Sequence, residues 1–242
     1  MRTFASLFIL LLSITSVSCQ NKDNNKNNFD ASQLIDSLQW IQQACFKITL
    51  DGLTIYTDPY QLKFDDKADI ILITHPHGDH FDTTQISKIA TQNTVVIGPA
   101  ECKYTKDIKQ FIEFLPGKEY KYSENIVIKA VPAYNVVKSN FHAKNKNWIG
   151  YLISYKGITI YHAGDTERIP EMQNFTADIA LVPLGQKYTM NSVEEAAESV
   201  KDVKAKYAIP MHYGLYEGSD EDALKFKTLL EPGIKVIIKP RQ

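Results

Sequence analysis

A dense group of potential metal ligands lies in the segment THPHGDHFD, which begins at Thr74. The segment holds three of the six histidines of the chain, His75, His77 and His80, together with Asp79. His75 and His77 are two residues apart, so in an extended segment both imidazoles lie on the same side. Neutral imidazole and carboxylate are ligands that zinc, iron and manganese accept. The spacing therefore predicts a metal site rather than a solvated polar turn.

Two later segments place further potential ligands directly after expected strands. IYHAGDT contains Asp165, and IPMHYG contains His212. The neighbouring glycines, Gly164 and Gly214, would let the backbone come close to the site. Because open α/β sheets bind ligands at the carboxyl ends of their strands, we expect the three segments to meet at one edge.

These motifs carry a resemblance to a known group of proteins. HxHxDH, followed by a GD segment and a late strand-borne histidine, resembles the metallo-β-lactamase superfamily. YHAGDT, ADIALVPLG, YTM and AIPMHYG are similar more narrowly to the branch that contains ascorbate-6-phosphate lactonase and N-acyl-phosphatidylethanolamine phospholipase D. The resemblance implies an α/β fold, an αββα sandwich of two mixed β-sheets flanked by helices. It also implies two divalent metal ions, with zinc expected first and manganese or iron as alternatives.

The same resemblance implies which residues hold the two ions. The first ion would be held by His75 and His77, the second by Asp79, His80 and His212, and Asp165 would bridge both. His162 is interpreted instead as a core residue or one that supports a ligand from behind.

The third histidine of the first site is the point at which this chain departs from the family pattern. The corresponding position is Asn135, and the nearest histidine is His142, seven residues further on. We expect His142 to complete the site. The alternatives are an oxygen ligand from Asn135 or a depleted site. Folding this loop back over the metals would bring Lys138, Lys144 and Lys146 near the mouth, where they could attract an anionic substrate.

A pair of ions implies a specific kind of chemistry. A water shared by two divalent ions has a lowered pKa, so a metal-bridging hydroxide would be the nucleophile. Asp79 could take the proton of the attacking water. Tyr134 and Tyr188 are candidates for contacting the substrate and protonating its leaving group, although aromatic packing explains them equally well.

We therefore expect a metal-dependent hydrolase that cleaves an ester-type bond, a phosphodiester, lactone or related bond, in a small-molecule or lipid-like substrate. A site of this kind serves many reactions, so the fold does not choose among them. The alternative is a non-catalytic, membrane-tethered module that binds or senses metal through a depleted site.

The sequence predicts alternating strands and helices over residues 37–242, with no internal linker and no marked repeat. These elements must position the candidate ligands. Asp51-Gly52 and Lys156-Gly157 mark two hairpins. ADIILITH, TVVIGP and ADIALVPLG are apolar runs typical of buried strands. Helices are predicted over DTTQISKIATQ, DEDALKFKTLLE and SVEEAAESVKDVKA, the last with a capping box of Ser192 and Glu195.

The N-terminal segment is typical of export rather than of a fold. Residues 1–19 have an early arginine, an apolar run too short to span a bilayer, and small residues before Cys19. SVSC resembles a lipobox, so we favour a lipid-anchored cell-envelope protein over an ordinary signal peptide. Residues 20–36 are predicted to be a polar flexible tether.

Composition limits the remaining possibilities. The chain has 27 basic and 28 acidic residues, so nucleic acid is not expected as a partner. Cys45 lies in a strand-like stretch where a buried free thiol is expected, and a disulfide with Cys102 is the less favoured reading.

Overall fold

The computed structural model describes residues 30–103 and 108–242. The first of its two sheets has six strands in chain order: β1 (Leu38–Gln42), β2 (Cys45–Leu50), β3 (Leu53–Thr57), β4 (Ile70–Leu72), β5 (Val95–Gly98) and β6 (Gln110–Glu113). β1 to β3 are antiparallel, and β3 to β6 are parallel. The predicted hairpin joins β2 to β3, with Asp51 and Gly52 at φ 48° and 84°, as a type I′ turn requires.

The second sheet has seven strands: β7 (Glu119–Lys121), β8 (Ile126–Pro132), β9 (Ile149–Tyr155), β10 (Ile158–His162), β11 (Ile179–Pro183), β12 (Tyr207–Met211) and β13 (Lys235–Val236). β7 to β10 are antiparallel, and β10 to β13 are parallel. Each half of the chain thus builds antiparallel strands first and parallel strands afterwards. This topological repeat has no visible counterpart in the sequence.

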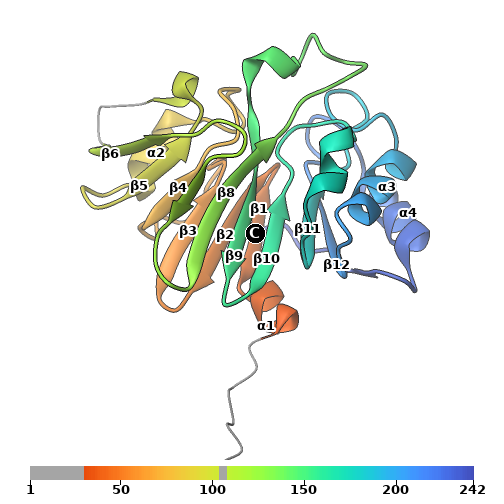
Figure 1. Ribbon diagram of the computed structural model, residues 1–242, viewed down its shortest axis with the longest axis horizontal. Coiled ribbons are helices and arrows are strands. Elements are labelled where there is room, and N and C mark those ends of the chain that lie inside the picture. Colours follow the sequence, from red (N-terminus) through yellow and green to blue (C-terminus); the bar gives the residue numbers. More distant parts are fainter. Residues whose placement is uncertain (1–29, 104–107) are drawn as a thin grey trace, which may run out of the picture.

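Helices cover the outer faces of both sheets. The α-helices are α1 (Ala31–Asp36), α2 (Thr83–Ile89), α3 (Val193–Asp202) and α4 (Asp220–Leu230), and the short 3-10 helices are η1 (Ala100–Cys102), η2 (Lys144–Lys146) and η3 (Pro170–Asn174). In Figure 1, α2 lies beside β4 and β5, whereas α3 and α4 lie beside β11 and β12. The expected αββα sandwich of two mixed sheets is confirmed.

Strand β4 contributes side chains to two separate hydrophobic cores, one on each face of its sheet. In β4, Ile70 and Leu72 enter the core shared by the two sheets, while Ile71 packs with Ile86 and Ile89 of α2. A strand covered on both faces cannot alternate apolar with polar residues, which explains the continuous run ADIILIT. β4 therefore ends at a rigidly held point, directly before the histidine segment.

The predicted tether over residues 20–36 is wrong in its last part, because residues 31–36 form α1. The Asp30 carboxylate caps this helix by accepting hydrogen bonds from the N–H groups of Ser32 and Gln33. Leu34 is fully buried and Ile35 nearly so. Residues 31–36 therefore belong to the fold, and the predictions for residues 1–29 lie outside the described residues.

The predicted capping box of α3 is only half formed. Ser192 accepts a hydrogen bond from the Glu195 N–H at 3.1 Å, as expected. The Glu195 carboxylate instead accepts hydrogen bonds from the N–H groups of Arg168 and Asn191. Its role is to hold two loops beside the helix, which the local sequence pattern does not indicate.

Cys45 and Cys102 are both free and both buried, so the less favoured disulfide is not formed. Burial raises the pKa of each thiol, which keeps both protonated and unreactive.

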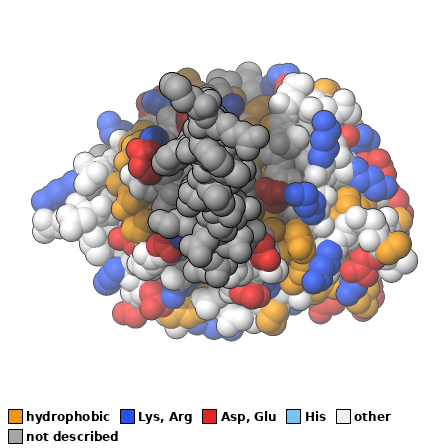
Figure 2. Space-filling view, turned by 60° about the horizontal axis from the view of Figure 1, so that its bottom comes forward, with side chains coloured by type: hydrophobic (Ala, Val, Ile, Leu, Met, Phe, Trp, Pro, Cys, Tyr) orange, Lys and Arg blue, Asp and Glu red, His pale blue; other side chains and the backbone are white. Residues whose placement is uncertain are grey.

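Within residues 30–103 and 108–242, no helix has the length and apolar character needed to cross a bilayer. On the face shown in Figure 2, acidic and basic side chains are interspersed.

Replacing Leu34 tests whether α1 belongs to the fold. We expect Leu34→Ala to lower the free energy of unfolding by about 2–5 kcal/mol, because the side chain is completely buried. Asp36→Ala, at an exposed position of the same helix, is the control. Chemical denaturation of both variants measures the difference, and equal stabilities would return residues 31–36 to the tether.

Candidate metal centre

Asp58 fixes the start of the histidine segment. It directly follows β3, and its carboxylate accepts hydrogen bonds from the Thr74 N–H at 2.8 Å and the Thr74 hydroxyl at 2.7 Å. The same carboxylate lies 2.9 Å from Nδ1 of His80. Asp58 has a left-handed backbone with φ 40°, a conformation that is strained for a residue with a side chain. Asp58, at the end of β3, thus orients the His80 ring through Nδ1, and Nε2 of that ring faces His212.

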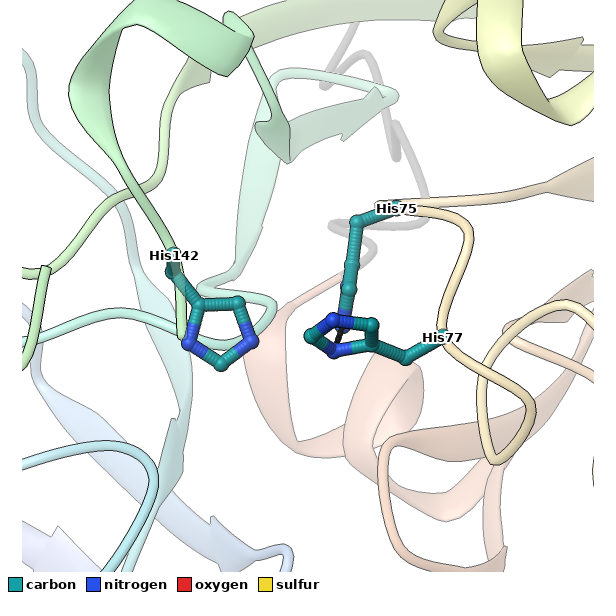
Figure 3. Close-up of side chains that lie close together, drawn as sticks. All are labelled: His75, His77 and His142. Carbon is teal, nitrogen blue, oxygen red and sulfur yellow. Dashed lines mark hydrogen bonds between the residues drawn. The ribbon is translucent and has the colours of Figure 1, made fainter. Parts of the chain in front are cut away.

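Three imidazoles form a first set of donors: His75, His77 and His142. One ring nitrogen from each lies within 4.8 Å of the others. Figure 3 shows His142 approaching from the opposite side to His75 and His77. Nε2 of His75 is 3.0 Å from Nδ1 of His77, so the two nitrogens cannot both carry a proton. Lone pairs that converge in this way suit a cation.

A second set consists of Asp79, His80 and His212, whose donor atoms also lie within 4.8 Å of one another. The Nε2 atoms of the two histidines are 3.3 Å apart, and each lies 3.7 Å from Oδ2 of Asp79. His212 comes directly after β12 and has a left-handed backbone, φ 58°. Such strain at a buried polar residue is typical of functional sites.

Asp165 lies between the two sets and faces each with a different oxygen. Its Oδ1 is 3.4 Å from Nε2 of His80 and 3.2 Å from Nε2 of His212. Its Oδ2 is 3.5 Å from Nε2 of His142 and 3.9 Å from Nε2 of His75. The residue is buried, so its charge has to be balanced by groups in the site.

The donor set fits a metal. Among the described residues, Nε2 of His142 is fully buried and has no hydrogen-bond partner. An unpartnered buried polar atom is unfavourable unless a cation or water completes it. Imidazole nitrogens and carboxylate oxygens are the donors that zinc, manganese and iron accept.

The structure places Asn135 behind His142, not beside the donors. Its backbone N–H donates to the carbonyl of His142 at 2.7 Å, and its side-chain nitrogen lies 3.2 Å from Nδ1 of the same ring. The Asn135 amide also donates to the carbonyl of Tyr188 at 2.7 Å. The loop after β8 therefore turns back on itself. It brings His142, and not Asn135, beside His75 and His77.

Glu167 holds this loop. Its buried carboxylate accepts hydrogen bonds from the N–H groups of Val136, Val137 and Lys138 at 2.7–2.8 Å. Burial alone would raise the pKa of Glu167, but the three backbone donors lower it below the usual value. A single ionised carboxylate thus pins three consecutive residues on the path to His142. Its sequence position, two residues after Asp165, was the only available signal.

Glu217 has the corresponding role on the other side of the centre. Its carboxylate accepts hydrogen bonds from the N–H groups of Lys187 and Tyr188, and its Oε1 lies 2.9 Å from Nδ1 of His212. A Cβ at Gly185 would lie 1.7 Å from the carboxyl group of Glu217, so only glycine leaves room for this contact. Sequence reasoning missed Glu217, because nothing in its local pattern separates it from an exposed loop carboxylate.

Gln43 is a further residue that sequence reasoning missed. It lies in the turn between β1 and β2 at φ 50°, and its carbonyl accepts a hydrogen bond from the His212 N–H at 3.0 Å. Its side-chain nitrogen donates to Oδ2 of Asp79 at 3.2 Å, while its buried Oε1 has no partner among the described residues. The turn therefore places an amide directly against the second set.

His162, by contrast, lies 2.8 Å from the carbonyl of Ala44 and belongs to neither set, as expected.

A cavity of about 390 Å³ opens onto both donor sets. Apart from the donors and Gly78, its lining consists of Tyr60, Phe141, Tyr188 and Tyr216. The expected position of Tyr188 at the site agrees with this lining. The expectation for Tyr134 is wrong, because its hydroxyl is turned away and donates to Glu171 at 2.8 Å.

The three loop lysines do not face the cavity. Lys138 donates to the carbonyl of Met190 at 3.0 Å, Lys144 to Glu171 at 2.8 Å, and Lys146 to Glu101 at 3.4 Å. No lysine or arginine is among the described residues that line the cavity. The structure therefore places none of the three lysines in the cavity lining, and their long-range attraction of an anionic substrate stays a prediction.

The two sets differ in protonation. Burial lowers the pKa of His75 and His77, and it lowers that of His142 to about 4, so the first set is neutral at pH 7. Burial also opposes the charge of His212, but Asp165 outweighs it and raises the pKa of His212 to about 10. Asp165 acts in the same direction on His80. The second set therefore retains a proton at pH 7 when no metal is bound.

Comparison with known proteins agrees with this geometry. Residues 37–212 match the family model described as the beta-lactamase superfamily domain. The chain is 34% identical over 216 residues to a UPF0173 metal-dependent hydrolase of Geobacillus sp., covering 80% of this chain and 92% of that protein. It is 30% identical over 212 residues to the corresponding protein of Methanopyrus kandleri, covering 80% and 91%.

Solved structures show the same relationship. A protein from Parabacteroides distasonis, described as a metal-dependent hydrolase, superposes with a TM-score of 0.75 at 33% identity, over 85% of this chain and 93% of that one. The fold and the donor sets together define a metallo-β-lactamase superfamily protein. Within that class, the chain belongs to the UPF0173 metal-dependent hydrolase family, and its histidine and aspartate groups are able to hold metal.

Metal binding should release protons from the second set. A group whose pKa is raised is protonated in the metal-free protein at pH 7 and must lose that proton to become a ligand. We therefore expect the zinc affinity of this set to fall as the pH drops below 7. Each proton released on binding should contribute about a tenfold loss of affinity per pH unit. Calorimetry at pH 7 in buffers of different ionisation enthalpy measures the release, and heats that are equal in all buffers would contradict it.

Proposed function

We propose that the protein is a hydrolase that uses two divalent metal ions, zinc in the first place, to cleave an ester-type bond in a small-molecule or lipid-like substrate. The observation that carries the proposal is the position of Asp165, whose two oxygens face two separate donor sets. A carboxylate in that position suits two neighbouring ions, as two-metal hydrolysis requires. The motif resemblance to the lactonase and phospholipase branch supports an ester-type bond.

The residues divide the work of hydrolysis. When bound, two divalent ions supply an activated water and polarise the oxygen of the scissile bond. Asp79 is the least buried of the carboxylates in the site and lines the cavity, so it can take the proton of the attacking water. The Gln43 amide holds one oxygen of Asp79 and leaves the other available.

The cavity favours an uncharged substrate portion beside the scissile bond. Its walls are aromatic, and no cationic side chain lines it among the described residues. An additional anionic group would lose its hydration there without gaining a partner. Carboxylic esters and lactones therefore suit the site better than substrates with several phosphates.

The alternative of a non-catalytic metal-binding module depended on a depleted first site. With His142 beside His75 and His77, that set offers three imidazoles, which supports the enzyme over the module. We also propose, from residues 1–19 alone, that the protein is exported and lipid-anchored in the cell envelope.

Replacing His142 tests the two-ion site. We expect His142→Ala to weaken one bound zinc by more than the roughly 10–100-fold typical of residues that only support a ligand, and to leave the other less affected. Asn135→Ala, which removes the support behind the ring, should stay within that range. Zinc titration against a chromophoric chelator gives both affinities, and unchanged affinity and stoichiometry in His142→Ala would rule the residue out as a ligand.

A substrate panel tests the reaction itself. The zinc-loaded protein is incubated with carboxylic esters, lactones and phosphodiesters, and metal-dependent turnover of an ester or lactone is expected. Complete inactivity at two zinc ions per chain would instead favour the binding module.

Mass spectrometry of the mature protein tests the anchor. We expect the chain to begin at Cys19 and to carry the added mass of acyl chains on that residue, because the small residues before it form the lipobox-like SVSC. An unmodified N-terminus at any position would reject the lipoprotein.

A further inference from the structure

Two phenol hydroxyls meet at the cavity, and the reaction described above has no assigned use for them. The hydroxyl oxygens of Tyr60 and Tyr216 are 2.5 Å apart. Tyr60 lies two residues after Asp58, which holds His80, and Tyr216 lies four residues after His212. The contact therefore joins a loop of the first sheet to a loop of the second, beside the residues of the second donor set. Both tyrosines line the cavity that contains those donors.

The hydrogen bonds around this pair leave one hydroxyl hydrogen unused. Two hydroxyls carry two hydrogens, and their mutual hydrogen bond consumes one of them. The Gln61 amide donates to the Tyr60 oxygen at 3.2 Å, which favours Tyr60 as the donor to Tyr216. The Tyr216 hydrogen then has no acceptor among the described residues and can point into the cavity. A chain of donors running from Gln61 through Tyr60 to Tyr216 polarises that last hydroxyl.

Tyr216 also stays protonated at neutral pH. The hydrogen bond with Tyr60 and burial together raise the pKa of Tyr216 to about 12. A phenol in this state donates a hydrogen bond and releases its proton only to a strong base, such as a departing alkoxide.

We propose that the Tyr60–Tyr216 pair is the proton donor to the leaving group, with Tyr216 as the residue that contacts it. This assignment rests on the ester hydrolysis proposed above. The water oxygen adds to the carbonyl carbon, and the water proton passes to Asp79. The carbon–oxygen bond of the leaving group then breaks, and its electron pair remains on the leaving oxygen.

The leaving oxygen takes the proton of Tyr216 and departs as an alcohol. Tyr60 stabilises the resulting phenolate by donating its hydrogen bond. Solvent then returns a proton to Tyr216 and receives the one held by Asp79. The net reaction consumes one water and yields one acid and one alcohol, and both residues return to their starting states.

Tyr188, the other tyrosine of the cavity, differs from this pair. Its ring packs edge-on against Phe141 at a centroid distance of 5.0 Å, and the Lys187 ammonium lies 4.6 Å from its ring centre. Among the described residues, its hydroxyl has no polarising donor of the kind that Gln61 provides to Tyr60. Tyr188 therefore serves as a wall of the cavity, and it offers a matched control.

A series of esters with one acyl group and different leaving groups tests the assignment. The zinc-loaded chain is assayed with the acetates of 4-nitrophenol, phenol, trifluoroethanol and ethanol. A good leaving group departs without a proton, whereas ethoxide needs one. For Tyr216→Phe we expect kcat/KM to stay within about threefold of wild type with 4-nitrophenyl acetate and to fall about 10²–10⁴-fold with ethyl acetate.

Two further variants separate proton donation from a structural role. Tyr60→Phe should show the same trend with a smaller loss, because Tyr216 keeps its own proton. Tyr188→Phe should change all four esters by one common factor. Tyr216 is 49% exposed, so loss of its hydroxyl should leave thermal stability and zinc content at wild-type values.

The outcomes are distinguishable. A Tyr216→Phe loss that rises steadily as the leaving group worsens supports the pair as the donor. An active wild type with an equal loss, or no loss, across the series overturns the assignment and leaves the hydrolase intact. A zinc-loaded wild type that cleaves none of the esters overturns both.

Discussion

The structure depends on keeping five imidazoles and two carboxylates together where water is largely excluded. Donor atoms so close to one another repel unless a cation lies between them or outer groups hold them. Four of the imidazoles contact a supporting side chain through Nδ1, the ring nitrogen that faces away from the other donors. The supporting residues are Thr74 for His75, Asp58 for His80, Glu217 for His212 and Asn135 for His142. These outer contacts fix which nitrogen of each ring is directed inward.

The sandwich provides the outer contacts through the ends of its strands. Asp58 follows β3, the histidine segment follows β4, Asp165 follows β10 and His212 follows β12. A Cβ at Gly164 would come within 3.1 Å of the Thr74 side chain, so glycine lets the β10 end approach the β4 end. The parallel strands thus bring residues far apart in the chain to one edge, and the loop after β8 (green, top of Figure 1) rises from that edge.

The fold class and most of the donors were predictable from the sequence, because their signals are local. Continuous apolar runs indicate buried strands, and HxHxDH is compact enough to be read without a structure. The supporting carboxylates were not predictable. Asp58, Glu167 and Glu217 act across 16 to 31 residues, on Thr74, on Val136 and on Lys187, and no local pattern marks them.

Errors in the prediction have the same origin. Tyr134 was expected at the cavity because of its sequence distance from the donors, but its hydroxyl donates to Glu171. The loop lysines, expected near the mouth, are likewise turned toward Glu171, Glu101 and Met190. α1 was assigned to the tether because its polar neighbours hide a short apolar pair, Leu34 and Ile35. Side-chain direction in an irregular segment is set by tertiary contacts rather than by spacing.

The division of the donors between the halves of the chain links metal supply to the lifetime of the protein. The β4 segment of the first sheet provides four donors, and the second sheet provides His142, Asp165 and His212. An ion bound at this seam would join one half to the other, and an ion that binds the folded chain alone would stabilise it by about 2.7 kcal/mol at a hundred times its dissociation constant. A cell short of metal would then hold a protein whose halves separate more readily, and proteolysis would remove the empty copies first.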